Sequence, residues 1–324
     1  MDLGTEAHRV ATQTSFTGVV RLDAAGATAF ERAYGMAHRG LGVENTVDTR
    51  FAIASGTKPL TALAVMSLVE DGTLELSTTA RSVLGADLPL IDDAVTVEQL
   101  LAHRSGIGDY YDEDGDPSLP APAQDLAMTE QYLPFLDGYP QKFPPGAKFN
   151  YNNGAFVVLA LLAERASGVA FHDLVAQRVC APAGLVDTAF LRSDEPDRRM
   201  ALGYVDTNGL RTNVFDLPVR GSGDGGSYTT VADFHALWRS FFAGRVVSSK
   251  WVDEMIRPRS VHDGKRALRY GLGFWLHESS DAVIVMGSDP GVSFWSEAAP
   301  SGAFARTVVG NATDTAWPVV RLFG

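Results

Sequence analysis

The stretch Phe51-Ala-Ile-Ala-Ser-Gly-Thr-Lys58, with the apolar run that follows it, predicts the centre of the fold. Ser55 and Lys58 are three residues apart, a spacing that places two side chains on one face of a helix. A serine hydroxyl is a good nucleophile only when a base lies within hydrogen-bond reach, and a desolvated lysine of lowered pKa can be that base. None of the other four lysines has a serine three residues before it. The pair is therefore a candidate nucleophile and base.

A buried helix is expected to begin at about Ser55. Pro59 lacks an N–H and is tolerated in a helix only near its first turn. The run from 60 to 69 is apolar nearly all round, which is typical of a core helix, and Gly72 is the expected stop. First-turn N–H groups could hold an oxyanion beside Ser55. The alternative is an ordinary N-terminal turn that carries a serine and a lysine.

Length and composition set the broad class of protein. The 324 residues are 45% hydrophobic and 20% charged, which is typical of a globular protein with a large core. The net charge of -12 argues against nucleic acid or an anionic membrane surface as a partner. No apolar run is long enough to span a bilayer, and the absence of a signal peptide predicts a cytoplasmic protein if Met1 is the natural start. The single cysteine, Cys180, is expected to be buried, and nothing in the sequence indicates an oligomeric state.

Strand-forming runs lie at both ends of the chain, and helical runs lie in the middle. Strands are expected at 16–22, 29–34, 51–54, 270–276, 282–286, 292–297 and 303–310. Helices are expected at 96–106, 150–168, 171–179, 230–242 and 248–255, with capping boxes at Thr96–Gln99 and Thr230–Asp233. Residues 73–91 and 190–227 look irregular.

We expect an α+β fold in which strands from both chain ends form one antiparallel sheet flanked by helices, with an inserted mainly helical region. Residues 1–72 and 240–324 would build the sheet domain, and residues 73–239 the inserted domain. The active site would lie in the groove between them, a usual place for a ligand site.

A second group of polar residues stands where the helix over 150–168 is expected to begin. Tyr151 could act as a general acid or base if a nearby cation stabilises its phenolate. Asn153 could orient a substrate amide or the lysine. The alternative is that Tyr-x-Asn is a helix cap, since asparagine is favoured at that position.

Four motifs occur in an order that resembles a known family. They are Ser55-Gly-Thr-Lys58, Leu100-Leu-Ala-His-Arg-Ser-Gly106, Pro145-Gly146 followed by Tyr151-Asn152-Asn153, and Gly225-Gly226-Ser227 leading to Thr230 and Asp233. Together they resemble the class C β-lactamase-like serine hydrolases, which include penicillin-binding proteins, D,D-peptidases, D-aminopeptidases and esterases. The resemblance covers roughly residues 17–310. It implies a β-lactamase/transpeptidase-like fold and a hydrolase that acts on a small ester, amide or peptide without a cofactor.

The same resemblance implies a role for each polar residue. Ser55 is the nucleophile that becomes acylated, and Lys58 is its base. Tyr151 would relay a proton to the leaving group, and Asn153 would bind the acyl amide of the substrate and Lys58. The backbone N–H of Ser55 would form half of the oxyanion hole.

The third motif of the family departs from the pattern. A Lys-Thr-Gly or His-x-Gly sequence is expected on a strand beside the nucleophile, but residues 285–293 contain no lysine or histidine. Its expected counterpart is Ser288-Asp289-Pro290 or, one residue later, a tripeptide ending at Gly291. An aspartate there would repel a substrate carboxylate, which favours esters or amides that are uncharged or carry an amine. The second N–H of the oxyanion hole is expected from Gly291 or Val292.

Three other patterns are rejected as sites. Gly221-Ser-Gly-Asp-Gly-Gly226 matches a dinucleotide-binding fingerprint, but Pro218 makes the segment before it a poor central strand, so a loop near the groove is expected. The acidic residues over 109–116 lack the glycine and glutamate spacing of a calcium loop, so a solvated acidic, proline-rich loop is expected over 109–125. The seven histidines include no His-x-x-x-His pair, so no metal site is expected.

Two alternative functions stay open. One is a D,D-carboxypeptidase or β-lactamase. The other is a catalytically impaired penicillin-binding-protein-like protein that binds a ligand or a partner, which the altered third motif would allow. The presence of Ser55, Lys58, Tyr151 and Asn153 together favours an active enzyme.

Overall fold

The computed structural model describes residues 2–112, 119, 122–261 and 268–323. Much of the acidic loop expected over 109–125 therefore lies outside the described residues. No single helix in these ranges is long and apolar enough to cross a membrane, although Asn153–Ser167 and Phe171–Ala183, which meet at a bend of 84°, pass that test as a pair.

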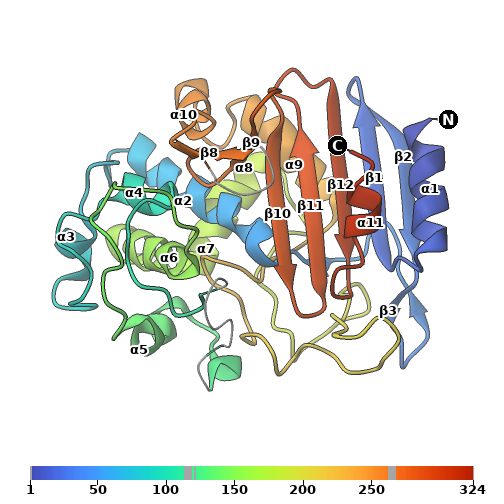
Figure 1. The fold of residues 1–324 in the computed structure, drawn as a ribbon, viewed down its shortest axis with the longest axis horizontal. Coiled ribbons are helices and arrows are strands. Elements are labelled where there is room, and N and C mark those ends of the chain that lie inside the picture. Colours follow the sequence, from blue (N-terminus) through green and yellow to red (C-terminus); the bar gives the residue numbers. More distant parts are fainter. Residues whose placement is uncertain (1, 113–118, 120–121, 262–267, 324) are drawn as a thin grey trace.

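Within the described part of the chain, eight strands form one antiparallel sheet in the order β2-β1-β12-β11-β10-β9-β8-β7 (Figure 1). These strands are β1 (Gly18–Ala24), β2 (Ala27–Tyr34), β7 (Ser260–Val261), β8 (Leu268–Tyr270), β9 (Trp275–His277), β10 (Val283–Asp289), β11 (Val292–Ala298) and β12 (Phe304–Gly310). The two ends of the chain meet where β1 pairs with β12, with Gly18 opposite Gly310. The expected sheet from both chain ends is confirmed, and the strands expected at 16–22 and 29–34 pair in it as β1 and β2.

The single strand expected over 270–276 was wrong. β8 and β9 are the two arms of a hairpin, and residues 271–274 form the turn. Gly273 has φ +85°, which glycine adopts without a steric penalty. A Cβ at Gly273 would lie 2.3 Å from the Cβ of Ala62. The turn therefore packs directly against a helix, which the local sequence does not reveal.

Helices cover both faces of the sheet. One face packs against α1 (Leu3–Gln13) and α11 (Trp317–Val320), and the other against α2 (Lys58–Glu70) and α9 (Val231–Phe242) (Figure 1). Side chains alternate along each strand, so neighbouring residues enter different cores. Val20 and Ile284 pack with α1 and α11, whereas Val19 and Val285 pack with α2. Burial of α2 on all sides confirms the core helix expected after Ser55.

The other helices and short strands are α3 (Ala80–Leu84), α4 (Val97–Leu101), α5 (Leu133–Leu136), α6 (Asn153–Ser167), α7 (Phe171–Val175), α8 (Ala181–Ala183), α10 (Ser249–Met255), β3 (Met36–His38) and β4 (Val43–Glu44). In Figure 1, α3, α4, α5 and α6 lie together on the side of the molecule away from β2. α2 and α6 share the main hydrophobic core. This arrangement supports an inserted helical region, but its boundaries at 73 and 239 stay a prediction.

Several expectations about the helices need correction. α1 was not predicted, although the Asp2 side chain caps it through the N–H of Thr5. α3 lies in a segment that was expected to be irregular. The capping box at Thr96 is confirmed, but α4 ends at Leu101 rather than at 106. The single cysteine is buried, as expected.

A two-residue strand, β5 (Phe51–Ala52), leads into the Ser55 turn and pairs with β6 (Tyr228–Thr229) rather than with the large sheet. The backbone N–H of Ile53 also donates to the carbonyl of Ser227, at 3.0 Å. The Ser55 turn is thus attached to the segment that follows the glycine-rich loop.

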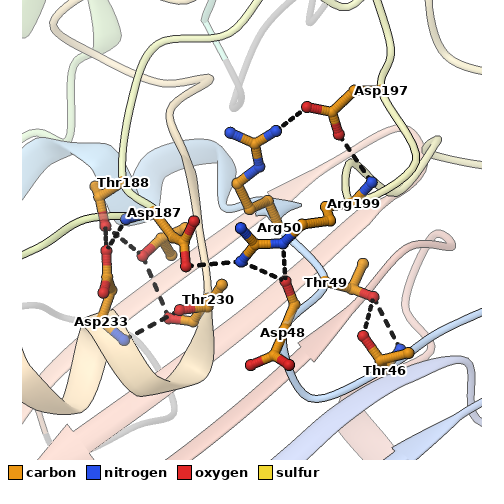
Figure 2. Close-up of polar contacts among 11 residues, drawn as sticks. Thr46, Asp48, Thr49, Arg50, Asp187, Thr188, Asp197, Arg199, Thr230 and Asp233 are labelled. Carbon is orange, nitrogen blue, oxygen red and sulfur yellow. Dashed lines mark hydrogen bonds and ion pairs between the residues drawn. The ribbon is translucent and has the colours of Figure 1, made fainter.

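A polar cluster fixes the start of β5 to residues 187–199 (Figure 2). Arg50 pairs with Asp197, and Arg199 donates to Asp187 at 2.7 Å. The Asp233 carboxylate accepts from the N–H of Asp187 at 2.7 Å. The capping box expected at Thr230 is therefore only half correct, because the Asp233 side chain turns to this cluster.

Candidate active site

Ser55 lies in a tight turn between β5 and α2. Residues Ala54–Thr57 form a 3-10 turn that continues into α2. Ala54 has φ +49°, a left-handed conformation that side chains other than glycine rarely adopt. Such strain persists only where the surroundings impose it, and it is often found at functional sites. Ser55 is half-buried, whereas the residues on either side of it in this turn are buried.

Lys58 is only 2% exposed, and hydrogen bonds hold its amine in place. Lys58 Nζ donates to Ser55 Oγ at 2.8 Å, to Asn153 Oδ1 at 2.7 Å and to the carbonyl of Asp224 at 2.8 Å. All three partners are uncharged oxygens, and the Ser55 hydroxyl can donate to Nζ when Lys58 is a neutral amine. The structure thus brings the predicted serine and lysine into hydrogen-bond contact.

Tyr151 lies directly beside this amine. The Lys58 Nζ is 4.8 Å from the centroid of the Tyr151 ring, within the range of a cation–π contact. The ring of Trp275 stacks on Tyr151, with centroids 6.0 Å apart and an interplanar angle of 12°. Trp275 is therefore a wall of the site and not simply a core residue.

Asn153 is the first residue of α6, and its side-chain amide contacts Lys58. Besides accepting from Lys58, it donates through Nδ2 to the carbonyl of Tyr111 at 3.1 Å. The helix cap is its neighbour, Asn152, whose Oδ1 accepts from the N–H of Ala155. The helix-cap alternative thus applies to Asn152 and leaves Asn153 to hold the lysine.

Asp109 anchors this end of α6. Its carboxylate accepts from the N–H groups of Asn153 and Gly154, at 2.7 and 2.8 Å. Burial raises the pKa of Asp109 to about 7, and the backbone N–H donors oppose that shift. A buried carboxyl group therefore fixes the position of Asn153.

The glycine-rich loop 221–226 closes the other side of Lys58. A Cβ at Gly223 would lie 2.1 Å from the carbonyl oxygen of Phe156, so the loop packs directly on α6. This close approach places the carbonyl of Asp224 against Lys58. The loop lies at the site, as expected, and it contributes a backbone acceptor to the lysine.

β10 passes the Ser55 turn at Gly287. A Cβ on Gly287 would lie 2.1 Å from the carbonyl oxygen of Ile53 and 2.9 Å from the N–H nitrogen of Ser55. Gly287 is therefore the residue of β10 that lies against the Ser55 turn, immediately before the Ser288-Asp289-Pro290 segment expected to replace the third motif. The residue that follows it, Ser288, is exposed at the edge of the strand.

The expected oxyanion-hole donors at Gly291 and Val292 need correction. The N–H of Gly291 donates to Thr313 Oγ1 at 2.8 Å. Val292 pairs with Asp289 across a two-residue hairpin turn, so this pair carries ladder hydrogen bonds. Hydrogen-bonded and non-hydrogen-bonded pairs alternate along an antiparallel ladder. The next pair, Ser288 with Ser293, is therefore not hydrogen-bonded, and the N–H of Ser288 points away from β11. Gly291 packs instead against Gly203, at the tip of the hairpin.

A pocket opens beside the Ser55 turn. Ala54 lines it next to Ser55, and Gly225 and Tyr110 line its wall. Two side chains with carboxylates, Asp224 and Asp289, also line it. The Tyr110 hydroxyl donates to Asp224 Oδ2 at 2.6 Å. No lysine, arginine or histidine occurs among the described residues of the lining.

The model of the Beta-lactamase family matches residues 5–317. The chain belongs to the beta-lactamase family. The penicillin binding protein from Bacillus halodurans superimposes with a TM-score of 0.91 at 32% identity, over 98% of both chains, and confirms the β-lactamase/transpeptidase-like fold.

Two enzymes are also similar to this beta-lactamase family member. Esterase EstB of Burkholderia gladioli is 35% identical over 189 residues, which cover 55% of this chain and 47% of the esterase. D-aminopeptidase of Brucella anthropi is 31% identical over 275 residues, which cover 81% of this chain and 49% of that enzyme. The matches thus span about half of the length of each enzyme. The family includes serine hydrolases of esters and peptides.

Sequence reasoning missed three contributors to this site. Asp109 lay in a segment interpreted as a solvated acidic loop, and the carbonyl of Asp224 has no side-chain signature. His103 belongs to one of the matching motifs, but no role was assigned to it. The sequence indicated a role for His103 only in part, through its place in that motif immediately after a capped helix.

Proposed function

We propose that this family member is a serine hydrolase that forms an acyl-enzyme at Ser55. The observation that carries the proposal is the buried Lys58 Nζ, 2.8 Å from Ser55 Oγ. Bonds to Asn153 and to the Asp224 carbonyl aim the amine at the hydroxyl, which is the geometry that a general base needs.

The proposed reaction begins when Ser55 Oγ attacks the carbonyl carbon of an ester or amide while its proton passes to Lys58. The backbone N–H groups of Ser55 and Ser288 would donate to the oxyanion that forms. The bond to the leaving group then breaks, and the leaving group takes a proton from Tyr151, which regains one from Lys58. Water releases the acyl group by the reverse sequence of proton transfers.

The substrate that we propose is an ester or amide that is uncharged or carries an amine near the scissile bond. Asp224 and Asp289 line the pocket beside Ser55, where a substrate carboxylate would be repelled. The similarity to an esterase and to a D-aminopeptidase supports the same range. A β-lactamase or D,D-carboxypeptidase would have to bind a carboxylate in this setting. The catalytically impaired alternative predicts no reaction at Ser55.

Three reagents separate these possibilities: a fluorophosphonate, p-nitrophenyl butyrate and a fluorescent penicillin. We expect a fluorophosphonate adduct on Ser55 by intact mass, a rapid release of p-nitrophenol and no stable penicillin label. Ser55→Ala is the matched control and should show neither adduct nor release. Penicillin labelling as fast as ester turnover would favour the peptidase or β-lactamase alternative, and no reaction with any reagent would contradict the hydrolase.

A further inference from the structure

His103 occupies an unusual position directly behind Tyr151. It follows α4 and is only 1% exposed. Its backbone has φ +53°, in the left-handed region where histidine, asparagine and aspartate are the side chains tolerated best. A strained residue inside a core indicates that the surroundings require this conformation.

This one residue binds the backbone on both sides of Tyr151. The carbonyl of His103 accepts from the N–H of Asn150 at 2.9 Å. The ring Nδ1 of His103 accepts from the N–H of Asn152 at 3.1 Å. The tyrosine therefore stands on a peptide segment that is fixed immediately before and immediately after it.

The imidazole also contacts the side chain of Tyr151. The two ring centroids are 4.4 Å apart, with the planes 36° from parallel. The rings of Tyr270 and Phe156 enclose the imidazole further, at 4.8 and 5.0 Å. An enclosed ring of this kind cannot rotate away without disturbing the tyrosine.

The hydrogen bond from Asn152 defines the form of the imidazole. A backbone N–H can only donate, so Nδ1 is unprotonated and Nε2 carries the proton. Burial and the nearby Lys58 lower the pKa of His103 well below its ordinary value. The ring is thus a neutral acceptor, enclosed away from solvent, and it serves the site through its contacts with Tyr151 rather than by reacting.

We propose that His103 is a positioning residue that holds the Tyr151 hydroxyl where it can protonate the leaving group. This inference depends on the proposed function, in which Tyr151 supplies that proton. Loss of the Nδ1 acceptor would release one side of the tyrosine backbone. The effect should then appear only in reactions whose leaving group needs a proton.

Two esters that share the same acyl group separate reactions whose leaving group needs a proton from reactions whose leaving group does not. p-Nitrophenolate departs without a proton, whereas the ethoxide of ethyl butyrate needs one. The quantity to measure is kcat/KM, which reports the steps up to departure of the leaving group, normalised to active sites titrated with a fluorophosphonate. The variants are His103→Leu, which lacks the acceptor, and His103→Asn, whose Oδ1 can accept from Asn152 and whose backbone tolerates the left-handed conformation. Tyr151→Phe is the reference.

We expect His103→Leu to lose about 10²-fold in kcat/KM for ethyl butyrate, the scale of a misplaced catalytic group, through kcat rather than KM. The same variant should stay within about threefold of the wild type for p-nitrophenyl butyrate, and His103→Asn within about threefold for both esters. If His103→Leu does not fold, His103→Phe, which keeps an aromatic ring without the acceptor, replaces it.

Each other outcome overturns one part of the account. Equal losses on both esters in His103→Leu, or no rescue by His103→Asn, would mean that His103 is only structural. If Tyr151→Phe shows the selective loss and the His103 variants do not, the inference fails and the proposed function stands. If Tyr151→Phe shows no selective loss, the proposed role of Tyr151 fails first.

Discussion

Gly287→Ala tests how closely β10 must approach the nucleophile. The new Cβ would lie 2.1 Å from the Ile53 carbonyl oxygen and 2.8 Å from the backbone nitrogen of Gly56. Carbon and oxygen atoms normally approach to about 3.3 Å, so the strand and the Ser55 turn must separate by about 1 Å. Both contacts are with backbone atoms, and no side chain can rotate to relieve them.

A displacement of that size at the reacting serine should lower kcat/KM about 10²-fold. The forced contact should also reduce the free energy of unfolding by about 1–3 kcal/mol. Gly40→Ala is the matched control, because nothing lies within 4 Å of a Cβ there and its φ is not positive. It should leave both quantities near those of the wild type.

The assay is hydrolysis of p-nitrophenyl butyrate, normalised to active sites titrated with a fluorophosphonate, together with unfolding in urea. A wild-type rate in Gly287→Ala would refute the reasoning, because the oxyanion hole would then not depend on the spacing of Gly287 and Ser55. A loss that Gly40→Ala shares would point to a general effect of replacing glycine.

Three further predictions follow from the site and its charges. Lys58→Met should lower kcat/KM for the p-nitrophenyl ester by about 10²–10⁴-fold. The control Lys250→Met, at an exposed position on α10, should have no effect, and equal losses in the two variants would contradict a role of Lys58 as base. Ser288→Ala keeps the backbone N–H and should be active, while Ser288→Pro removes it and should lower kcat/KM by about 10²–10³-fold. Full activity of the proline variant would exclude the Ser288 N–H as an oxyanion donor. Burial raises the pKa of Asp109 to about 7, so its stabilising contribution is complete below about pH 4 and is lost as the pH rises through about 7. Relative to Asp109→Asn, the wild type should therefore lose roughly 3 kcal/mol in urea unfolding between pH 4 and 7, and a flat difference would refute the shift.

The sequence predicts most of the site because its main signals are local. Ser55 and Lys58 share one helical turn, and their pattern can be read from eight consecutive residues. Tyr151 and Asn153 stand at a helix start whose apolar run is unmistakable. The strands at the two chain ends are short runs rich in apolar and β-branched residues, which is enough to predict the sheet.

The parts that were missed depend on contacts between distant segments. Gly287 is needed because β10 lies against the Ser55 turn, and no property of the neighbouring residues in the sequence predicts that contact. The carbonyl of Asp224 reaches Lys58 across 166 residues, and every residue has a carbonyl. Asp109 was interpreted from an acidic surrounding sequence, whereas its own carboxylate is buried under α6. α1 was missed because its short apolar face consists largely of alanines.

The most direct test of the central claim is a rapid-quench measurement of the acyl-enzyme. The chain is mixed with p-nitrophenyl butyrate, quenched in acid and digested, and each serine-containing peptide is weighed by mass spectrometry. We expect one butyryl group per chain, on the peptide that contains Ser55, with no such adduct and no turnover in Ser55→Ala. An adduct on another residue, or hydrolysis that persists in Ser55→Ala, would contradict the central claim.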